Sequence, residues 1–220
     1  MILGADVVIP VKRLTESKTR LSTLLSSKDR QKLVLVMMED VIASLKKSSL
    51  VNHVVVLTPD SRVADHGKKL GVETMMDKTN GDINDSLTEA TNFEIRERSG
   101  SSFLVLPVDV PLVKPTTIDS IISRVGKPNH PVVVISPSIT NGTNALLRNP
   151  PDAIPTRYGV NSFDAHVAEA VARKVHLEIH RSDDLEIDVD TPGDLYEVMR
   201  KGDSSKTSEF LKNVLKGQKS

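Results

Sequence analysis

Cysteine is absent from this chain, and aromatic residues are scarce. Without cysteine, the 220 residues cannot form disulfides, thiolate nucleophiles or cysteine metal sites. The sequence has no tryptophan, four phenylalanines and two tyrosines, which argues against the aromatic platforms that stack on single-stranded nucleic acid.

An excess of charge of one sign is missing as well. Lys plus Arg and Asp plus Glu number 29 each, so no basic surplus indicates a nucleic-acid binder. Apolar runs such as residues 54–57 are far too short to cross a bilayer, and no basic segment with a long apolar core opens the chain. We therefore expect a soluble cytoplasmic protein with neither a membrane nor a nucleic acid as partner.

Three familiar motifs are also lacking. The sequence has no Gly-x-x-x-x-Gly-Lys-Ser/Thr phosphate loop and no Gly-x-Gly-x-x-Gly fingerprint of dinucleotide redox enzymes. It has no nucleophile elbow for a Ser-His-Asp triad either. What remains is chemistry in which a metal ion and phosphate groups take part.

Short apolar segments do alternate with helical patterns along the chain. Strands are expected at 2–9, 54–57, 72–75, 102–106, 131–135, 145–147, 175–179 and 185–189. Helices are expected at 29–45, 61–70, 84–98, 116–125 and 162–174. This alternation predicts an α/β fold with a mostly parallel sheet flanked by helices. We expect one domain over residues 1–200, followed at 201–220 by a charged tail that is either a docking helix or a frayed end.

Carboxylates gather where two of these strands end. Asp188 and Asp190 come at the end of the strand expected at 185–189, and alternation along a strand would project both to one face. Two like charges this close are unfavourable unless a cation lies between them. Asp109 follows the strand expected at 102–106. Because Mg²⁺ is usually held by a few carboxylates plus substrate phosphates, these three residues predict a Mg²⁺ site.

Helix capping is the alternative interpretation of the second acidic segment. Asp190 or Thr191 can cap a helix that has Pro192 at its first position and Asp194 in its first turn. Capping accounts for Asp190 and Asp194 but leaves Asp188 without a purpose.

A basic loop follows the first expected strand. It carries four cations and one acid: Lys12, Arg13, Lys18, Arg20 and Glu16. Ligands of open parallel sheets bind beyond the carboxyl ends of the strands, so this position favours binding of a triphosphate. The alternative is a solvated basic loop without a ligand.

Polar, glycine-bearing turns occur at residues 140–144 and 157–163. The second leads into the helix expected at 162–174, where Asn161 or Ser162 can act as N-cap, and such a terminus suits a phosphate or a carboxylate. His166 lies one turn further on, and we leave it outside the predicted site. Asn84 follows another turn and is either an N-cap or an amide placed against a purine edge.

Taken together, these segments resemble the 2-phospho-L-lactate guanylyltransferase family of deazaflavin coenzyme F-420 biosynthesis. The most specific matches are PVK at 10–12, KTRL at 18–21, DVP at 109–111, GTNAL at 142–146, GxNSFxxH at 159–166 and DxDTxxDL at 188–195. The family is related to the nucleotidyltransferases that make nucleotide sugars and molybdopterin dinucleotides. The resemblance therefore implies a Rossmann-like sheet of the nucleotide-diphospho-sugar transferase kind.

The resemblance also implies a reaction and a role for each matched residue. GTP and 2-phospho-L-lactate would give lactyl-2-diphospho-5′-guanosine and pyrophosphate, with Mg²⁺ as cofactor. The implied residues are Lys12, Lys18 and Arg20 for the triphosphate, Asp109, Asp188 and Asp190 for the metal, Thr143, Gly159 and Ser162 for the acid, and Asn84 near the guanine. The family pattern before Asn84 is closer to Gly-Leu-Asn than the Gly-Asp-Ile-Asn found here.

Several alternatives stay open at this point. The acceptor can instead be phosphoenolpyruvate, a sugar phosphate or molybdopterin, and a non-catalytic nucleotide-binding protein would keep the same fold. The weakly amphipathic tail and the irregular second half are compatible with a homodimer.

Overall fold

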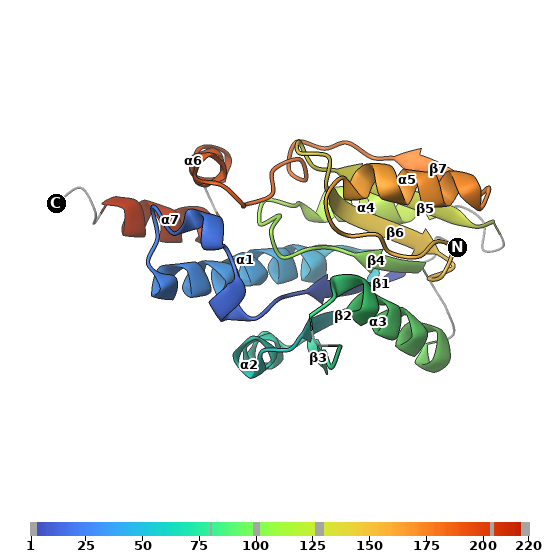
Figure 1. Ribbon diagram of the computed structural model, residues 1–220, viewed down its shortest axis with the longest axis horizontal. Coiled ribbons are helices and arrows are strands. Elements are labelled where there is room, and N and C mark those ends of the chain that lie inside the picture. Colours follow the sequence, from blue (N-terminus) through green and yellow to red (C-terminus); the bar gives the residue numbers. More distant parts are fainter. Residues whose placement is uncertain (1–3, 80, 99–101, 126–129, 203–204, 217–220) are drawn as a thin grey trace.

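The computed structural model describes residues 4–79, 81–98, 102–125, 130–202 and 205–216, in which helices cover both faces of a seven-stranded sheet (Figure 1). The strands are β1 (Ala5–Pro10), β2 (Val51–Thr58), β3 (Glu73–Met76), β4 (Ser102–Val105), β5 (Val132–Pro137), β6 (Thr143–Asn149) and β7 (His176–Ile179). Their order is β3-β2-β1-β4-β6-β5-β7, and β6 alone runs antiparallel to its neighbours. The expected α/β class with a mostly parallel sheet is confirmed.

The helices divide between the two faces of the sheet because strand side chains alternate. They are α1 (Ser27–Lys47), α2 (Ser61–Lys69), α3 (Ile83–Glu97), α4 (Pro115–Ile122), α5 (Ser162–Ala172), α6 (Pro192–Lys201) and α7 (Lys206–Lys216). In β1, Val7 and Ile9 join the core under α1, whereas Val8 joins the core under α3 and α5. Each face of the sheet therefore has its own apolar core.

The expected helices and all but one of the expected strands are present, with shifted ends. The helix expected at 116–125 divides into α4 and a short 3-10 helix, η3 (Ser123–Val125). Residues 2 and 3 of the first expected strand lie outside the described residues.

The strand expected at 185–189 is wrong. This segment is a loop, although Leu185, Ile187 and Val189 are buried in the core in strand-like alternation. The backbone N–H of Val189 donates to the carbonyl of Asp109 at 2.9 Å, but no ladder forms. Alternating burial against a core therefore produced a strand pattern without a strand.

The strand directions bring several loops to one end of the sheet. The carboxyl ends of the parallel strands β1, β2, β3 and β4 meet there. Pairing of Val105 in β4 with Leu146 in antiparallel β6 places the start of β6 at the same end. The loop that carries Asp109 and the residue Thr143 are thus neighbours at this edge, where ligands of such sheets bind.

Within the C-terminal tail, residues 206–216 form helix α7, which lies beside α1 although the two are far apart in sequence (Figure 1), and residues 203–204 and 217–220 lie outside the described residues. Asp40 of α1 accepts hydrogen bonds from the backbone of Lys206 and Thr207 and so caps α7. Leu211 of α7 is buried in the core under α1. Within the described residues, no helix is long and apolar enough to cross a membrane.

Candidate active site

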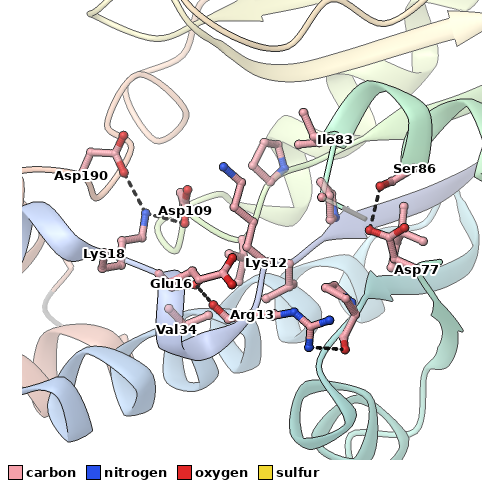
Figure 2. A pocket seen from close by; sticks show the side chains of 18 of the residues that line it. Lys12, Arg13, Glu16, Lys18, Val34, Asp77, Ile83, Ser86, Asp109 and Asp190 are labelled. Carbon is pink, nitrogen blue, oxygen red and sulfur yellow. Dashed lines mark hydrogen bonds and ion pairs between the residues drawn. The ribbon is translucent and has the colours of Figure 1, made fainter. Parts of the chain in front are cut away.

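A cleft of about 590 Å³ opens at the carboxyl end of the parallel strands (Figure 2). Its walls come from the basic loop after β1, the segment around residues 77–86, and the two acidic loops. The polar residues that line it include Lys12, Arg13, Glu16, Lys18, Asp77, Lys78, Ser86, Asp109 and Asp190. The cleft therefore combines the cations and carboxylates that the sequence placed in separate loops.

Lys18 occupies the space between two carboxylates. Its Nζ lies 2.7 Å from Oδ1 of Asp109 and 2.9 Å from Oδ1 of Asp190 (Figure 2). Burial lowers the pKa of Lys18, but the two carboxylates outweigh it, so the pKa is raised and the ammonium stays charged. The Lys18 backbone is left-handed, with φ of 54°, a conformation that costs about 1–3 kcal/mol in such residues. The ion pairs offset this strain.

Asp188 is a third carboxylate, close enough to Asp190 and Asp109 to be influenced by their charges. Burial raises its pKa, and the nearby charges of Asp190 and Asp109 raise it further. Because residues 185–189 are a loop, this proximity does not arise from strand alternation. The local excess of negative charge and the hard oxygen donors fit a divalent cation chemically. Among the described residues, however, no three acidic or histidine side chains already converge as a metal cluster.

Asp194 holds the start of α6 and leaves Asp190 available to Lys18. Its Oδ2 accepts hydrogen bonds from the backbone N–H groups of Asp190 and Thr191, at 3.0 and 2.6 Å. Thr191 is the N-cap and Pro192 the first helical residue, so the predicted helix cap is confirmed. Capping and the Lys18 ion pair therefore use different carboxylates.

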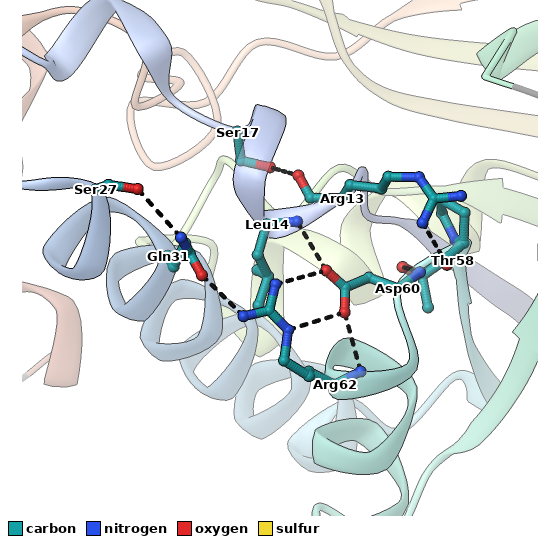
Figure 3. A network of polar contacts seen from close by, with 9 residues as sticks. Arg13, Leu14, Ser17, Ser27, Gln31, Thr58, Asp60 and Arg62 are labelled. Carbon is teal, nitrogen blue, oxygen red and sulfur yellow. Dashed lines mark hydrogen bonds and ion pairs between the residues drawn. The ribbon is translucent and has the colours of Figure 1, made fainter.

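The basic loop is anchored by Asp60, which sequence analysis missed (Figure 3). Asp60 caps α2, and its second carboxylate oxygen accepts the backbone N–H of Leu14 at 3.0 Å. Arg62 closes the arrangement with hydrogen bonds to both oxygens. An aspartate directly before the helix at 61–70 was the signal that could have identified it as an N-cap. The loop is thus fixed to the turn after β2.

Lys12 and Arg20, the other two residues predicted to bind the triphosphate, differ in position. Lys12 is exposed, lines the cleft and makes no hydrogen bond or ion pair with a described residue, so it is available to an anion. Arg20 is exposed on the short 3-10 helix η2 (Thr19–Leu21) and is not part of the cleft lining. Of the three predicted triphosphate residues, Lys12 and Lys18 therefore come together.

Thr143 and Ser162 meet in a buried network outside the cleft lining. The Ser162 hydroxyl donates to Thr143 Oγ1 at 3.2 Å, and Thr143 Oγ1 lies 3.0 Å from Nδ1 of His166. The backbone N–H of Arg157 donates to His166 Nε2 at 2.8 Å. Leaving His166 outside the site therefore missed a residue bonded to a predicted one. Its spacing of four residues from Ser162 on one helix was the available signal.

Gly159 and Asn84 are the last two predicted site residues. Gly159 has φ of 149°, a conformation that other residues rarely adopt, and open space lies beside it. The Asn84 side chain accepts from the N–H of Tyr158 at 2.7 Å and donates to its carbonyl at 3.0 Å. The N-caps are Asp82 for α3 and Asn161 for α5, so Asn84 and Ser162 are not capping residues. Like Thr143 and Ser162, these two residues lie outside the cleft lining.

Known proteins resemble the chain over nearly its whole length. The family described as Guanylyl transferase CofC like matches residues 5–217. The 2-phospho-L-lactate guanylyltransferase of Methanocaldococcus vulcanius is 34% identical, over 94% of this chain and 90% of its own. The phosphoenolpyruvate guanylyltransferase of Rubrobacter xylanophilus is 33% identical, over 88% and 92%.

Solved structures agree with the fold. A protein of Desulfovibrio desulfuricans G20, assigned to the nucleotide-diphospho-sugar transferases, superposes with a TM-score of 0.78 at 14% identity, covering 97% of both chains. A CMP:2-keto-3-deoxy-manno-octonic acid synthetase gives a TM-score of 0.60 at 14% identity, covering 89% of this chain and 96% of that chain. With the family match over residues 5–217, the chain belongs to the CofC-like guanylyltransferases, which are enzymes of the nucleotidyltransferase type.

Proposed function

We propose that this enzyme transfers GMP from GTP to 2-phospho-L-lactate and releases pyrophosphate, in the biosynthesis of coenzyme F-420. The observation that supports it best is the Lys18 ammonium between Asp109 and Asp190, in a cleft that Lys12 also lines. Such a cleft can receive a triphosphate together with a divalent cation. The name of the relative from Methanocaldococcus vulcanius supports the acceptor.

The proposed reaction is a direct in-line displacement. A phosphate oxygen of the acceptor attacks the α-phosphorus of GTP, the bond to the bridging oxygen breaks, and pyrophosphate leaves with the electron pair. No protein nucleophile is needed, because the acceptor phosphate is already ionised near neutral pH. Lys12 and Lys18 neutralise the charge that develops on the leaving group. Catalysis then consists of positioning and electrostatic stabilisation.

Mg²⁺ is the cofactor that we propose, held by Asp109, Asp190 and Asp188. When bound, it would neutralise phosphate charge and orient the triphosphate. The support for it is that three carboxylates share one buried ammonium: Lys18 pairs with Asp109 and Asp190, and burial together with the charges of these two residues raises the pKa of Asp188. A divalent cation would remove that imbalance.

On the acceptor side, we assign Thr143, Ser162 and Gly159 to the acid. Ser162 is the first residue of α5, whose dipole favours an anion, and its hydroxyl contacts that of Thr143 in β6. Contacts of Arg20 with the triphosphate and of Asn84 with the guanine stay predictions, since the first lies outside the cleft lining and the second is bonded to Tyr158.

Phosphoenolpyruvate is the second candidate for the acceptor. The relative from Rubrobacter xylanophilus bears that activity in its name and is 33% identical, close to the 34% of the Methanocaldococcus vulcanius relative. Both acids carry a carboxylate and a phosphate on the central carbon, and they differ only in the bond from that carbon to the terminal carbon, which is double in phosphoenolpyruvate and single in 2-phospho-L-lactate. The proposed site would hold either one by the same groups.

Pyrophosphate release tests this proposal directly. The enzyme is incubated with GTP, Mg²⁺ and either 2-phospho-L-lactate or phosphoenolpyruvate, with a chelator arm and with ATP and CTP as comparison nucleotides. We expect release with GTP and 2-phospho-L-lactate that the chelator abolishes. Release only with phosphoenolpyruvate would keep the mechanism and change the acceptor. Turnover with sugar phosphates alone, or GTP binding without turnover, would contradict the proposal.

A further inference from the structure

We propose that His166 is a positioning residue that acts through Thr143. It holds the Thr143 hydroxyl so that its hydrogen is available to an anionic oxygen of the acid substrate. This inference rests on the proposed function, because Thr143 and Ser162 are the residues that we assign to the acid. It adds a residue that contacts no substrate and yet sets how the substrate is held.

The contacts of His166 fix which ring nitrogen carries the hydrogen. The backbone N–H of Arg157 points at Nε2 from 2.8 Å, and an amide N–H can only donate. Nε2 must therefore be the unprotonated acceptor. In the neutral ring the hydrogen is then on Nδ1, which lies 3.0 Å from Thr143 Oγ1.

This tautomer determines what the Thr143 hydroxyl can do. Because Nδ1 is a donor, the Thr143 oxygen accepts from it, and the same oxygen accepts from the Ser162 hydroxyl at 3.2 Å. A hydroxyl has two acceptor positions and one hydrogen. Both acceptor positions are filled by the protein, and the hydrogen has no acceptor among the described residues. Thr143 is only 5% exposed, so a ligand oxygen that accepted this hydrogen would satisfy a buried hydrogen-bond donor.

The surroundings of His166 keep the ring in place. The side chain is fully buried, and its ring packs edge-on against Tyr158, with centroids 5.1 Å apart. Tyr158 is in turn held by Asn84 through both of its backbone groups. The ring therefore packs against Tyr158, which hydrogen bonds to Asn84 hold at the start of α3.

Charge around the ring also favours the neutral form. Burial lowers the pKa of His166 to about 4, and the positive charges of Arg148 and Arg157 contribute, against contrary effects of a hydrogen bond to the Ser162 backbone and of Glu169. The ring is thus neutral near pH 7, as the hydrogen-bond pattern requires. A charged ring would have to donate from both nitrogens and would lose the contact with the Arg157 amide.

Thr143 lies at the end of the sheet where the cleft opens, although it is not part of the cleft lining. Thr143 is the first residue of β6, and the pairing of Val105 with Leu146 brings that end of β6 beside the loop of Asp109. Ser162 begins α5 and its hydroxyl contacts that of Thr143, so the helix dipole and the Thr143 hydroxyl can act on the same anion. The geometry suits a carboxylate or phosphate oxygen of the acid.

Two substitutions separate the two hydrogen bonds of His166. His166→Asn keeps a donor near the position of Nδ1 and loses the acceptor for Arg157, whereas His166→Gln keeps that acceptor and loses the donor to Thr143. We expect His166→Gln to raise the KM for the acid about tenfold, with the KM for GTP unchanged. His166→Asn should stay within about threefold of wild type. The exposed His176→Gln is the matched control and should change neither constant.

A double-mutant cycle tests whether His166 acts through Thr143. Thr143→Val removes the hydroxyl at nearly constant volume, so adding His166→Gln to it should cause no further rise in the KM for the acid. Additive effects, or a larger effect of His166→Asn than of His166→Gln, would overturn the proposal.

Nitrogen NMR of the ring provides a test that needs no turnover. The wild-type protein should show His166 as the neutral Nδ1–H tautomer at pH 7, and the Nε2–H tautomer or a charged ring would overturn the proposal. Because this measurement is made on the wild-type protein, it does not depend on whether the His166 variants fold. If wild type released no pyrophosphate with any acid, the proposed function would fail, while the ring tautomer would still test the hydrogen-bond arrangement by itself.

Discussion

Lys18 Nζ lies 2.9 Å from Asp190 Oδ1, although 172 positions of the chain separate the two residues. The contact joins the loop after β1 to the N-terminus of α6, and the second ion pair, with Asp109, adds the loop after β4. One ammonium therefore holds three loops together at the end of the sheet where the cleft opens. Stability and activity should both depend on it.

Replacing this ammonium should show both effects. We expect Lys18→Met to lower kcat at least about 100-fold, because the leaving pyrophosphate loses a buried cation. The same change should lower the free energy of unfolding by roughly 1–2 kcal/mol, less than for a fully buried pair because both aspartates are partly exposed. Urea denaturation and initial rates measure the two effects. Lys28→Met, on an exposed lysine of α1, should alter neither.

Asp188 should matter to activity far more than to folding. Asp188→Asn removes a carboxyl group whose pKa is raised by burial and by neighbouring carboxylates. Because the folded protein disfavours the charged form of this group, the free energy of unfolding of the variant should stay equal or rise. Turnover should fall heavily if the residue helps to hold Mg²⁺. The readout apart from activity is the rise of Tm on adding MgCl₂, which should shrink in the variant.

The exposed Asp183→Asn provides the control for that experiment. It should keep wild-type turnover and the wild-type response of Tm to MgCl₂. Near-wild-type rates in Asp188→Asn would show that the metal assignment of this residue is wrong.

Glu94 should make the stability depend on pH on the alkaline side. Burial and the neighbouring Asp6 carboxyl raise the pKa of Glu94 to about 8, although Arg98 opposes the shift. The folded protein thus keeps a proton that the unfolded chain loses above its ordinary pKa of 4.5. The free energy of unfolding must therefore fall as pH rises from about 4.5 to about 8.

Glu94→Gln should remove most of this slope. At pH 9 the variant should be more stable than wild type by roughly 3–5 kcal/mol, since each pKa unit corresponds to about 1.4 kcal/mol. Urea denaturation at pH 5, 7 and 9 measures it. Glu97→Gln, on an exposed glutamate of the same helix, should leave the slope as in wild type, and an identical slope in both variants would contradict the prediction.

Asp60 should act on the nucleotide half of the site alone. Asp60→Ala removes the cap of α2 and the acceptor for the Leu14 amide, at a cost of about 1–2 kcal/mol in stability. Because the basic loop loses its anchor, we expect the KM for GTP to rise several-fold while the KM for the acid changes little. Asp65→Asn, an exposed residue of α2, is the matched control. Equal increases in both constants would argue against a local effect on the loop.

Local patterns predicted the elements well, because apolar periodicity and capping residues act within a few positions of each other. Thr191, Pro192 and Asp194 were interpreted correctly as a helix start. The same locality explains the error at 185–189. Alternating burial looks the same in a strand and in a loop packed on a core, and only the hydrogen-bond partners distinguish them.

The candidate site was predicted in part. The sequence placed Lys12, Lys18, Asp109 and Asp190 at strand ends, and the structure brings them to one cleft. For His166 the sequence offered only the spacing of four residues from Ser162, because a histidine on a helix is recognised as functional mainly through its spatial partners. Those partners, Thr143 and the Arg157 amide, belong to other segments.

The sequence by itself determined the alternation of strands and helices, the absence of cysteine chemistry, the helix caps and the residue types available to phosphate and metal. Tertiary structure alone decided that Lys18 fits between Asp109 and Asp190 and that His166 supports Thr143. The physical reason is that propensities and caps depend on neighbours along the chain. The contacts across the site depend instead on strand order and on the antiparallel insertion of β6, which join segments between 23 and 172 residues apart.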